Sequence, residues 1–280
     1  MGKKVRSIFI SVVAFFALTA LSFAGEIEDL HRSILYPTVR VRAESGVGSG
    51  IIFVSLKNVK GTFDTYILTN FHVVESSISI KEEWNPLTQK MVKKETRATV
   101  EIEQFKYQNL SQATGTLLIQ GDLIEWNKNQ DLALIKLRSD DKFDAVKLYP
   151  VGKENDLKIF MDVYACGAGN GRAPFPTKGQ ISSLRDEIDN LPYYMINAPI
   201  VFGNSGGGTF LANSKEFIGT PSRVAITFTS WAPNAVYHCG FIIPISRIYK
   251  WLNETGWECI YNPQAPSHEI WLKEKKNELK

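Results

Sequence analysis

Short runs of β-branched, aromatic and aliphatic residues recur along most of this chain, and turn residues separate them. Many short strands with no helices between them favour antiparallel barrels or sandwiches. Six runs precede the charged segment Arg138–Lys142 and six follow it. They are Thr38–Arg42, Ile51–Val54, Thr65–Thr69, Val100–Glu103, Gly115–Ile119, Leu132–Leu137, Val163–Ala165, Gln180–Leu184, Tyr193–Ile196, Thr209–Leu211, Val224–Thr229 and Phe241–Ile243. We therefore predict an all-β fold of two six-stranded antiparallel β-barrels.

Helices are expected only near the two ends of the strand-rich region. Apolar residues within Glu26–Leu35 share one helical face before Pro37 ends the segment. A second short helix is predicted after the last strand, with Ser246 as its N-cap and a stop between Asn253 and Gly256. The tail beyond Gly256 is expected to be loosely held.

The first residues have the pattern of a secretory signal peptide. Lys3, Lys4 and Arg6 precede the uncharged run Ile8–Leu21, and the small residue Ala24 follows it. The run is shorter than the roughly 20 apolar residues of a spanning helix. We expect cleavage after Ala24, export to the periplasm or the extracellular space, and no stable membrane insertion afterwards; an uncleaved membrane anchor is the alternative.

These features divide the chain into four predicted parts. Residues 1–24 form the signal peptide, 25–140 the N-terminal barrel, 141–256 the C-terminal barrel and 257–280 the tail. Without the signal, 29 basic and 29 acidic residues remain, so no basic stripe points to a nucleic-acid partner. Two glycine clusters, Gly46–Gly50 and Gly167–Gly171, do not open a helix in a βαβ unit, which argues against nucleotide binding.

Neither cofactors nor metals are predicted from the sequence. There is no HExxH motif and no paired His/Cys spacing of the kind that binds zinc. The chain has three cysteines, Cys166, Cys239 and Cys259. Export would permit one disulfide, and both the pairing of Cys239 with Cys259 and its pairing with Cys166 are open.

A serine enclosed by glycines stands between two apolar runs, in the segment Gly203–Gly208. Glycine allows backbone N–H groups to converge beside a hydroxyl, where they can hold the negative oxygen of a tetrahedral acyl intermediate. Ser205 is therefore a candidate nucleophile, and an ordinary turn is the alternative.

Acyl transfer by serine requires a base for the hydroxyl proton and an acid that orients the base. His72 directly follows a predicted strand and interrupts an apolar run, whereas His31, His238 and His268 lie in segments expected to be surface or packing. Asp131 stands at the start of a buried strand. A hydrogen-bonded core histidine and a strand-start turn residue are the purely structural alternatives.

The sequences around these three residues together resemble the trypsin-like serine proteases of chymotrypsin fold, and most closely the bacterial high-temperature-requirement (Deg-type) branch. The resemblance covers about residues 30–255. The matching segments are Gly48–Ile52, Tyr66–Asn70, Asp131–Leu134, Gly203–Gly207 and Gly240–Pro244.

The resemblance implies a serine endopeptidase. His72 would act as general base and then general acid, Asp131 would orient it, and Ser205 would be the nucleophile. The amides of Gly203 and Ser205 would form the oxyanion hole. Protein or peptide substrates are expected, and both a monomer and the trimer of many relatives are open. Because little of the chain follows the protease region, we expect no peptide-binding PDZ domain of the kind that many relatives carry.

The chain departs from the family pattern on both sides of the serine. Gly208 stands where the family usually has proline, and Val201-Phe202 stands where it has Asn-Pro. Such changes can reshape the active-site loop. The alternative function is therefore a catalytically inert binding or chaperone-like protein of the same fold.

In this fold the primary specificity pocket is walled by residues before the serine and by a strand that follows it. The residues assigned to these walls are Pro199, Ile200, Val201, Ile226, Thr227 and Phe228. They include no carboxylate, so we expect an uncharged, apolar residue before the scissile bond.

Overall fold

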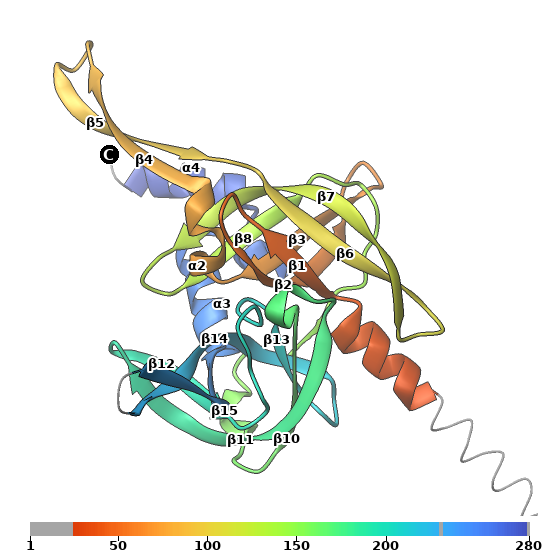
Figure 1. Ribbon diagram of the computed structural model, residues 1–280. Helices are drawn as coiled ribbons and strands as arrows, with labels where there is room; N and C mark the ends of the chain where they lie inside the picture. Colours follow the sequence, from red (N-terminus) through yellow and green to blue (C-terminus); the bar gives the residue numbers. More distant parts are fainter. Residues whose placement is uncertain (1–24, 230–231, 279–280) are drawn as a thin grey trace, which may run out of the picture.

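The computed structural model describes residues 25–229 and 232–278, and its first half is a closed barrel (Figure 1). The barrel closes in the order β1-β2-β3-β8-β7-β6, and every pairing is antiparallel. The strands are β1 (Thr38–Arg42), β2 (Val47–Lys57), β3 (Phe63–Thr69), β6 (Val100–Gln108), β7 (Gln112–Asn127) and β8 (Leu132–Leu137).

The second half closes in the same way. Its order is β13-β10-β11-β12-β15-β14, and the additional pairing of β13 with β14 completes the ring. The strands are β10 (Asp162–Gly167), β11 (Phe175–Ile188), β12 (Leu191–Ile196), β13 (Gly208–Leu211), β14 (Glu216–Thr229) and β15 (Ala232–Pro244). The short β9 (Lys147–Leu148) pairs with β14 in parallel, outside the ring. The predicted all-β fold of two six-stranded barrels is confirmed.

Strand periodicity explains how the barrels pack together. In β8, Leu132 and Leu134 belong to the larger core, which the second barrel dominates, whereas Ala133 and Ile135 belong to the interior of the first barrel. Successive side chains on a strand point to opposite faces. A continuous apolar run such as that of β8 therefore contributes side chains to both cores. Between the barrels, Phe53 meets the ring of Phe217 edge to face, with 6.2 Å between the ring centroids.

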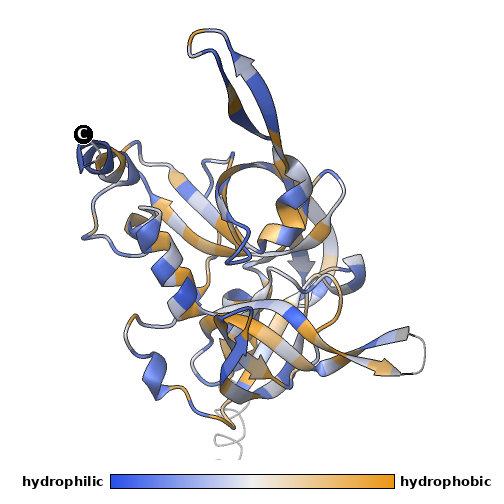
Figure 2. Ribbon diagram, turned by 90° about the vertical axis from the view of Figure 1, so that its left-hand side faces the viewer, coloured by the Kyte–Doolittle hydropathy of each residue, from blue (hydrophilic) through white to orange (hydrophobic). Residues whose placement is uncertain are grey.

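Two hairpins extend beyond the barrels (Figure 2). The strands β4 (Ile78–Asn85) and β5 (Lys90–Arg97) form a separate two-stranded sheet that the sequence analysis did not predict, because charged residues obscure its alternation. The second hairpin continues β14 and β15 as far as the pair Thr229 and Ala232. It is longer than the strand predicted at Val224–Thr229, and it carries residues that the sequence analysis assigned to the pocket.

The helices require two corrections to the sequence-based prediction. Helix α3 (Ile245–Glu254) follows Pro244 as its N-cap, so Ser246 lies inside the first turn and does not cap it. The tail is also more regular than expected, since it contains η5 (Glu258–Ile260) and α4 (His268–Glu278). The ring of His268 stacks on Trp257, with 4.0 Å between the centroids, which fastens the start of α4 to the end of the barrel domain.

The remaining helical segments are short. Residues 25–30 are α-helical, in agreement with the helix expected at Glu26–Leu35, and η1 (His31–Leu35) continues them. The others are α2 (Phe71–Val74), η2 (Glu75–Ser77), η3 (Glu154–Asp156) and η4 (Gly169–Gly171). Within the described ranges, none of the helices combines the length and apolarity required to cross a bilayer. The predicted signal peptide, residues 1–24, lies outside the described residues.

All three cysteines are free thiols, so neither disulfide considered from the sequence is formed. Cys166 is buried on β10, whereas Cys239 and Cys259 are half-buried. Burial raises the pKa of the Cys166 thiol to about 12.

Candidate active site

His72 reaches the crevice because a one-turn helix follows β3. Helix α2 buries Phe71, Val73 and Val74 in the first barrel, while the His72 side chain is 44% exposed. The polar residue that interrupts an apolar run is thus the outward-facing position of the turn. Asn70 precedes the helix in an extended conformation and is itself buried.

Asp131 orients the imidazole of His72 through its Nδ1 atom. Its carboxylate oxygens both lie 3.0 Å from His72 Nδ1, and Oδ1 also accepts the His72 backbone N–H at 3.1 Å. Asp131 adopts a left-handed conformation (φ 54°) directly before β8, and its own carbonyl accepts a hydrogen bond from the Asn70 side chain at 2.9 Å. With Nδ1 donating to the carboxylate, the neutral ring presents Nε2 as an acceptor.

A residue of the second barrel also binds the Asp131 carboxylate. The Ser222 hydroxyl, on β14, donates to Asp131 Oδ2 at 2.6 Å. The Asp131 side chain is only 13% exposed, so each of these donors replaces water at a charged group. Ser222 was not predicted from the sequence, because it precedes the strand expected at Val224–Thr229 and belongs to no local motif.

Ser205 stands in a tight turn that the glycines make possible. Gly203 (φ 96°) and Gly206 (φ 83°) are left-handed, and a Cβ on Gly206 would lie 2.2 Å from the Ser49 carbonyl oxygen. The Ser49 N–H donates to the Ser205 carbonyl at 2.8 Å, and the Ser49 hydroxyl donates to the Gly203 carbonyl at 2.6 Å. Strand β2 of the first barrel therefore fixes the turn that carries Ser205.

The glycine cluster Gly167–Gly171 also supports this turn. A Cβ on Gly167 would lie 2.9 Å from the Cα of Asn204, and one on Gly169 would lie 2.7 Å from the Asn204 side-chain oxygen. Gly167 and Gly169 therefore lie where the serine turn packs directly on the backbone and leaves no room for a side chain.

Within Gly203–Gly207, the backbone amides of Gly203 and Ser205 donate to no other described residue. The Phe202 carbonyl accepts the Asn170 N–H at 2.7 Å. Because C=O and N–H of a trans peptide point in opposite directions, this contact directs the Gly203 N–H away from Asn170.

The amide of Ser205 is oriented by the same principle. The Asn204 carbonyl accepts the Gly207 N–H at 2.9 Å, so the Ser205 N–H points away from Gly207. Two oriented, unused donors beside a hydroxyl are what an oxyanion requires.

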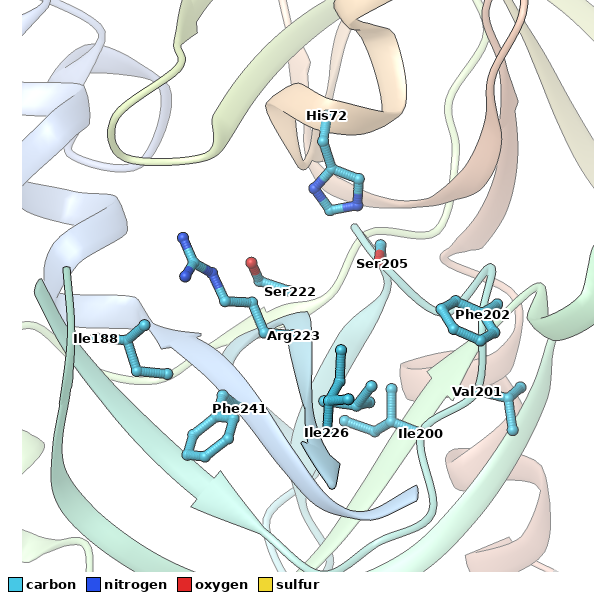
Figure 3. Close-up of a pocket in the computed structure, with 11 residues that line it drawn as sticks. His72, Ile188, Ile200, Val201, Phe202, Ser205, Ser222, Arg223, Ile226 and Phe241 are labelled. Carbon is cyan, nitrogen blue, oxygen red and sulfur yellow. The ribbon is translucent and has the colours of Figure 1, made fainter. Parts of the chain in front are cut away.

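His72 and Ser205 line one pocket of about 630 Å³ (Figure 3). In this view the Ser205 side chain lies below the imidazole. Within the described residues the two groups are not hydrogen-bonded to each other, which is common for catalytic pairs without substrate.

The pocket wall next to Ser205 is apolar. Of the residues assigned from the sequence, Ile200, Val201 and Ile226 line it. Pro199 lines a different pocket. Thr227 and Phe228 lie outside this pocket on the projecting hairpin, where Phe228 is 83% exposed, because β14 and β15 remain paired beyond the barrel.

Several pocket residues were not anticipated. They are Ile188, Phe202, Ser222, Arg223, Val224 and Phe241. Of these six residues, Arg223 alone has a charged side chain. Partial burial is the largest single influence on the pKa of Arg223 and lowers it, but the hydrogen bond with Asp189 and the electrostatic interactions with Tyr193, Asp189 and Asp131 together outweigh it, so the pKa is raised. The guanidinium is therefore a permanent positive charge at the pocket.

Paired antiparallel barrels with a serine and a histidine facing one pocket define a chymotrypsin-like fold. The family model of the trypsin-like peptidase domain matches residues 48–219. The chain belongs to this family. A search among curated proteins found no match.

Solved structures show the same fold. The serine endoprotease from Yersinia pestis has a TM-score of 0.55 with this chain at 19% sequence identity. The alignment covers 82% of this chain and 65% of that one, so the chain spans about two thirds of the length of the protein it resembles.

Proposed function

We propose that this peptidase-family chain is a serine endopeptidase with Ser205 as nucleophile, His72 as general base and Asp131 as the orienting acid. The observation that carries the proposal is the position of His72: Asp131 holds its Nδ1 at 3.0 Å, and its ring shares a pocket with the Ser205 hydroxyl. The orientation leaves Nε2 available for the serine proton.

The reaction would proceed through an acyl-enzyme. As Ser205 Oγ attacks the substrate carbonyl carbon, its proton passes to His72 Nε2, and the Gly203 and Ser205 amides bind the resulting oxyanion. The imidazolium then gives this proton to the leaving amine as the amide bond breaks. A water molecule repeats the sequence and releases the acyl group from Ser205. Asp131 stabilises the imidazolium throughout.

The apolar wall next to Ser205 supports a preference for an uncharged, apolar residue before the scissile bond. Ile200, Val201 and Ile226 supply aliphatic surface there and no carboxylate. We also propose export to the periplasm or the extracellular space, for which the pattern of residues 1–24 is the support.

Labelling with a fluorophosphonate tests the proposal, because the reagent requires an activated serine. We expect stoichiometric labelling of the intact protein, no labelling of Ser205→Ala, and loss of most labelling in His72→Ala. Circular dichroism on all three proteins controls for folding. A folded wild-type protein that takes no label would contradict the proposal and favour the inert binding or chaperone-like alternative.

A further inference from the structure

The pocket beside Ser205 combines an apolar wall with one cationic side chain. Arg223, on β14, lines the same pocket as His72 and Ser205. In Figure 3 its guanidinium lies on the side of Ser222, away from Val201 and Phe202. A substrate that fills the apolar part would therefore also pass a fixed positive charge.

Arg223 is held in place but not saturated. Its Nη1 donates to Asp189 Oδ2 at 2.7 Å, and its guanidinium lies over the Tyr193 ring, 5.6 Å from the centroid. Among the described residues this is its single side-chain hydrogen bond. The Nε and Nη2 groups remain, and together they form the edge of a guanidinium that binds both oxygens of a carboxylate.

The neighbouring acidic groups do not cancel this charge. Asp189 lies at the turn between β11 and β12 and is 69% exposed, so water screens its interaction with Arg223. The Asp131 carboxylate also interacts electrostatically with Arg223, but its oxygens accept hydrogen bonds from His72 and Ser222, and among the described residues it forms no ion pair with the guanidinium. The pocket therefore favours an anionic group on a bound substrate over a cationic one.

We propose that Arg223 is a specificity-determining residue that recognises an acidic side chain of the substrate, within about three positions of the apolar residue next to the scissile bond. The proposal rests on the proposed peptidase function. It deepens that function by naming the substrate class: peptides that combine an aliphatic residue with a nearby Glu or Asp.

Peptide cleavage tests this directly. Peptides with one fixed leucine would carry Glu, Gln or Lys at each of the three positions on either side of it. We expect the wild-type protein to cleave a Glu peptide more efficiently than its Gln counterpart at one of these positions, by about fivefold to tenfold in kcat/KM, the range expected for a half-exposed charged hydrogen bond. Lys at that position should be the poorest substrate.

Variants of Arg223 test whether its side chain causes the preference for Glu. Arg223→Gln should cleave Glu and Gln peptides equally, and Arg223→Lys should retain part of the preference. Asp189→Asn removes the competing carboxylate and should strengthen it. The matched control is Arg138→Gln, because Arg138 also pairs with an exposed aspartate, Asp122, at 2.7 Å but lies on the first barrel outside the pocket.

The outcomes separate this inference from the proposed function. If the wild-type protein takes the fluorophosphonate and cleaves Glu and Gln peptides equally at every position, the role of Arg223 is refuted and the peptidase proposal stands. An acidic preference that persists in Arg223→Gln refutes it as well. If no peptide is cleaved and no label is taken, the proposed function itself fails.

Discussion

The Ser222 hydroxyl on the second barrel donates a hydrogen bond to the Asp131 carboxylate on the first, at 2.6 Å. This contact crosses the crevice between the barrels, and the acceptor is the carboxylate that holds His72. The orientation of the histidine therefore depends on how the two barrels are docked. Each half of the site is built on one barrel, and the link between them can be tested with a single substitution.

Replacing Ser222 by alanine removes a hydrogen bond to a buried carboxylate. Because such bonds to charged groups contribute about 1.5–3 kcal/mol, we expect kcat to fall by about tenfold or more, with a small change in KM. Ser222→Thr keeps the hydroxyl and should restore most of the rate. Steady-state kinetics on a peptide substrate, with the melting temperature of each variant, would measure this. Equal kcat for the wild type and Ser222→Ala would show that the contact does not position His72.

The turn of Ser205 allows a comparison of two glycines. A Cβ on Gly203 would lie 2.8 Å from the Ala168 carbonyl oxygen, whereas Gly171 has open space around its Cβ position, and both have positive φ. Gly203→Ala should displace the amide that faces the oxyanion. We expect it to lower kcat/KM by about a hundredfold or more, the typical cost of losing one such donor.

Gly171→Ala is the matched control for that variant. It shares the strain of a left-handed alanine, about 1–2 kcal/mol, without the steric clash. We expect it to lower the unfolding free energy by that amount and to leave kcat/KM nearly unchanged. The comparison requires denaturant unfolding and peptide kinetics on both variants. Similar losses of activity in both would mean that backbone strain, and not the displaced amide, causes the effect.

Most of the architecture can be predicted from periodicity, because each barrel strand leaves an apolar run. The β4–β5 hairpin leaves none: its side chains are almost all exposed, so burial imposes no pattern on it. The tail helix α4 is missed for the same reason, since none of its residues is buried.

The candidate site divides in a similar way. His72, Asp131 and Ser205 can be found because each interrupts or bounds an apolar run in an unusual way. The side chains of Ser222 and Arg223 form hydrogen bonds with residues more than 30 positions away, Asp131 and Asp189. No local pattern reports such contacts. The family's proline is absent at Gly208 for a packing reason, because a Cβ there would lie 2.4 Å from the buried Phe210 ring.

Thiol reactivity should distinguish the three cysteines. Cys166 is fully buried and its pKa is raised from 9.0 to about 12, so it remains a protonated thiol at pH 8. The half-buried Cys239 and Cys259 are more accessible. In a titration with a chromogenic disulfide reagent at pH 8, we expect two thiols to react in the folded protein and the third only after unfolding in denaturant. Rapid reaction of all three in the folded protein would contradict the burial of Cys166.

Arg247 joins α3 to the turn that carries Asp131, and its loss should reduce both stability and rate. The side chain is 6% exposed; its Nη2 donates to the Gln130 carbonyl at 3.1 Å and its Nη1 to the Pro192 carbonyl at 3.0 Å. Arg247→Met keeps much of the packing but leaves both part-buried carbonyls without these donors. Because water can reach them in part, the lower end of the roughly 1–3 kcal/mol per unsatisfied group applies, and we expect the unfolding free energy to fall by about 2 kcal/mol.

The rate should also fall, because Gln130 is the chain neighbour of Asp131. We expect kcat to decrease in Arg247→Met at temperatures where the variant is still fully folded, which denaturant curves would establish. Arg247→Lys retains the charge and one donor, so it should lie between the wild type and Arg247→Met in both measurements. Lower stability with unchanged kcat would show that α3 holds the barrels together without positioning the carboxylate. Because Arg247 contacts neither His72 nor Ser205, a loss of rate would arise through residues that it does contact: Gln130, the neighbour of Asp131, or Tyr193, whose ring also lies under Arg223.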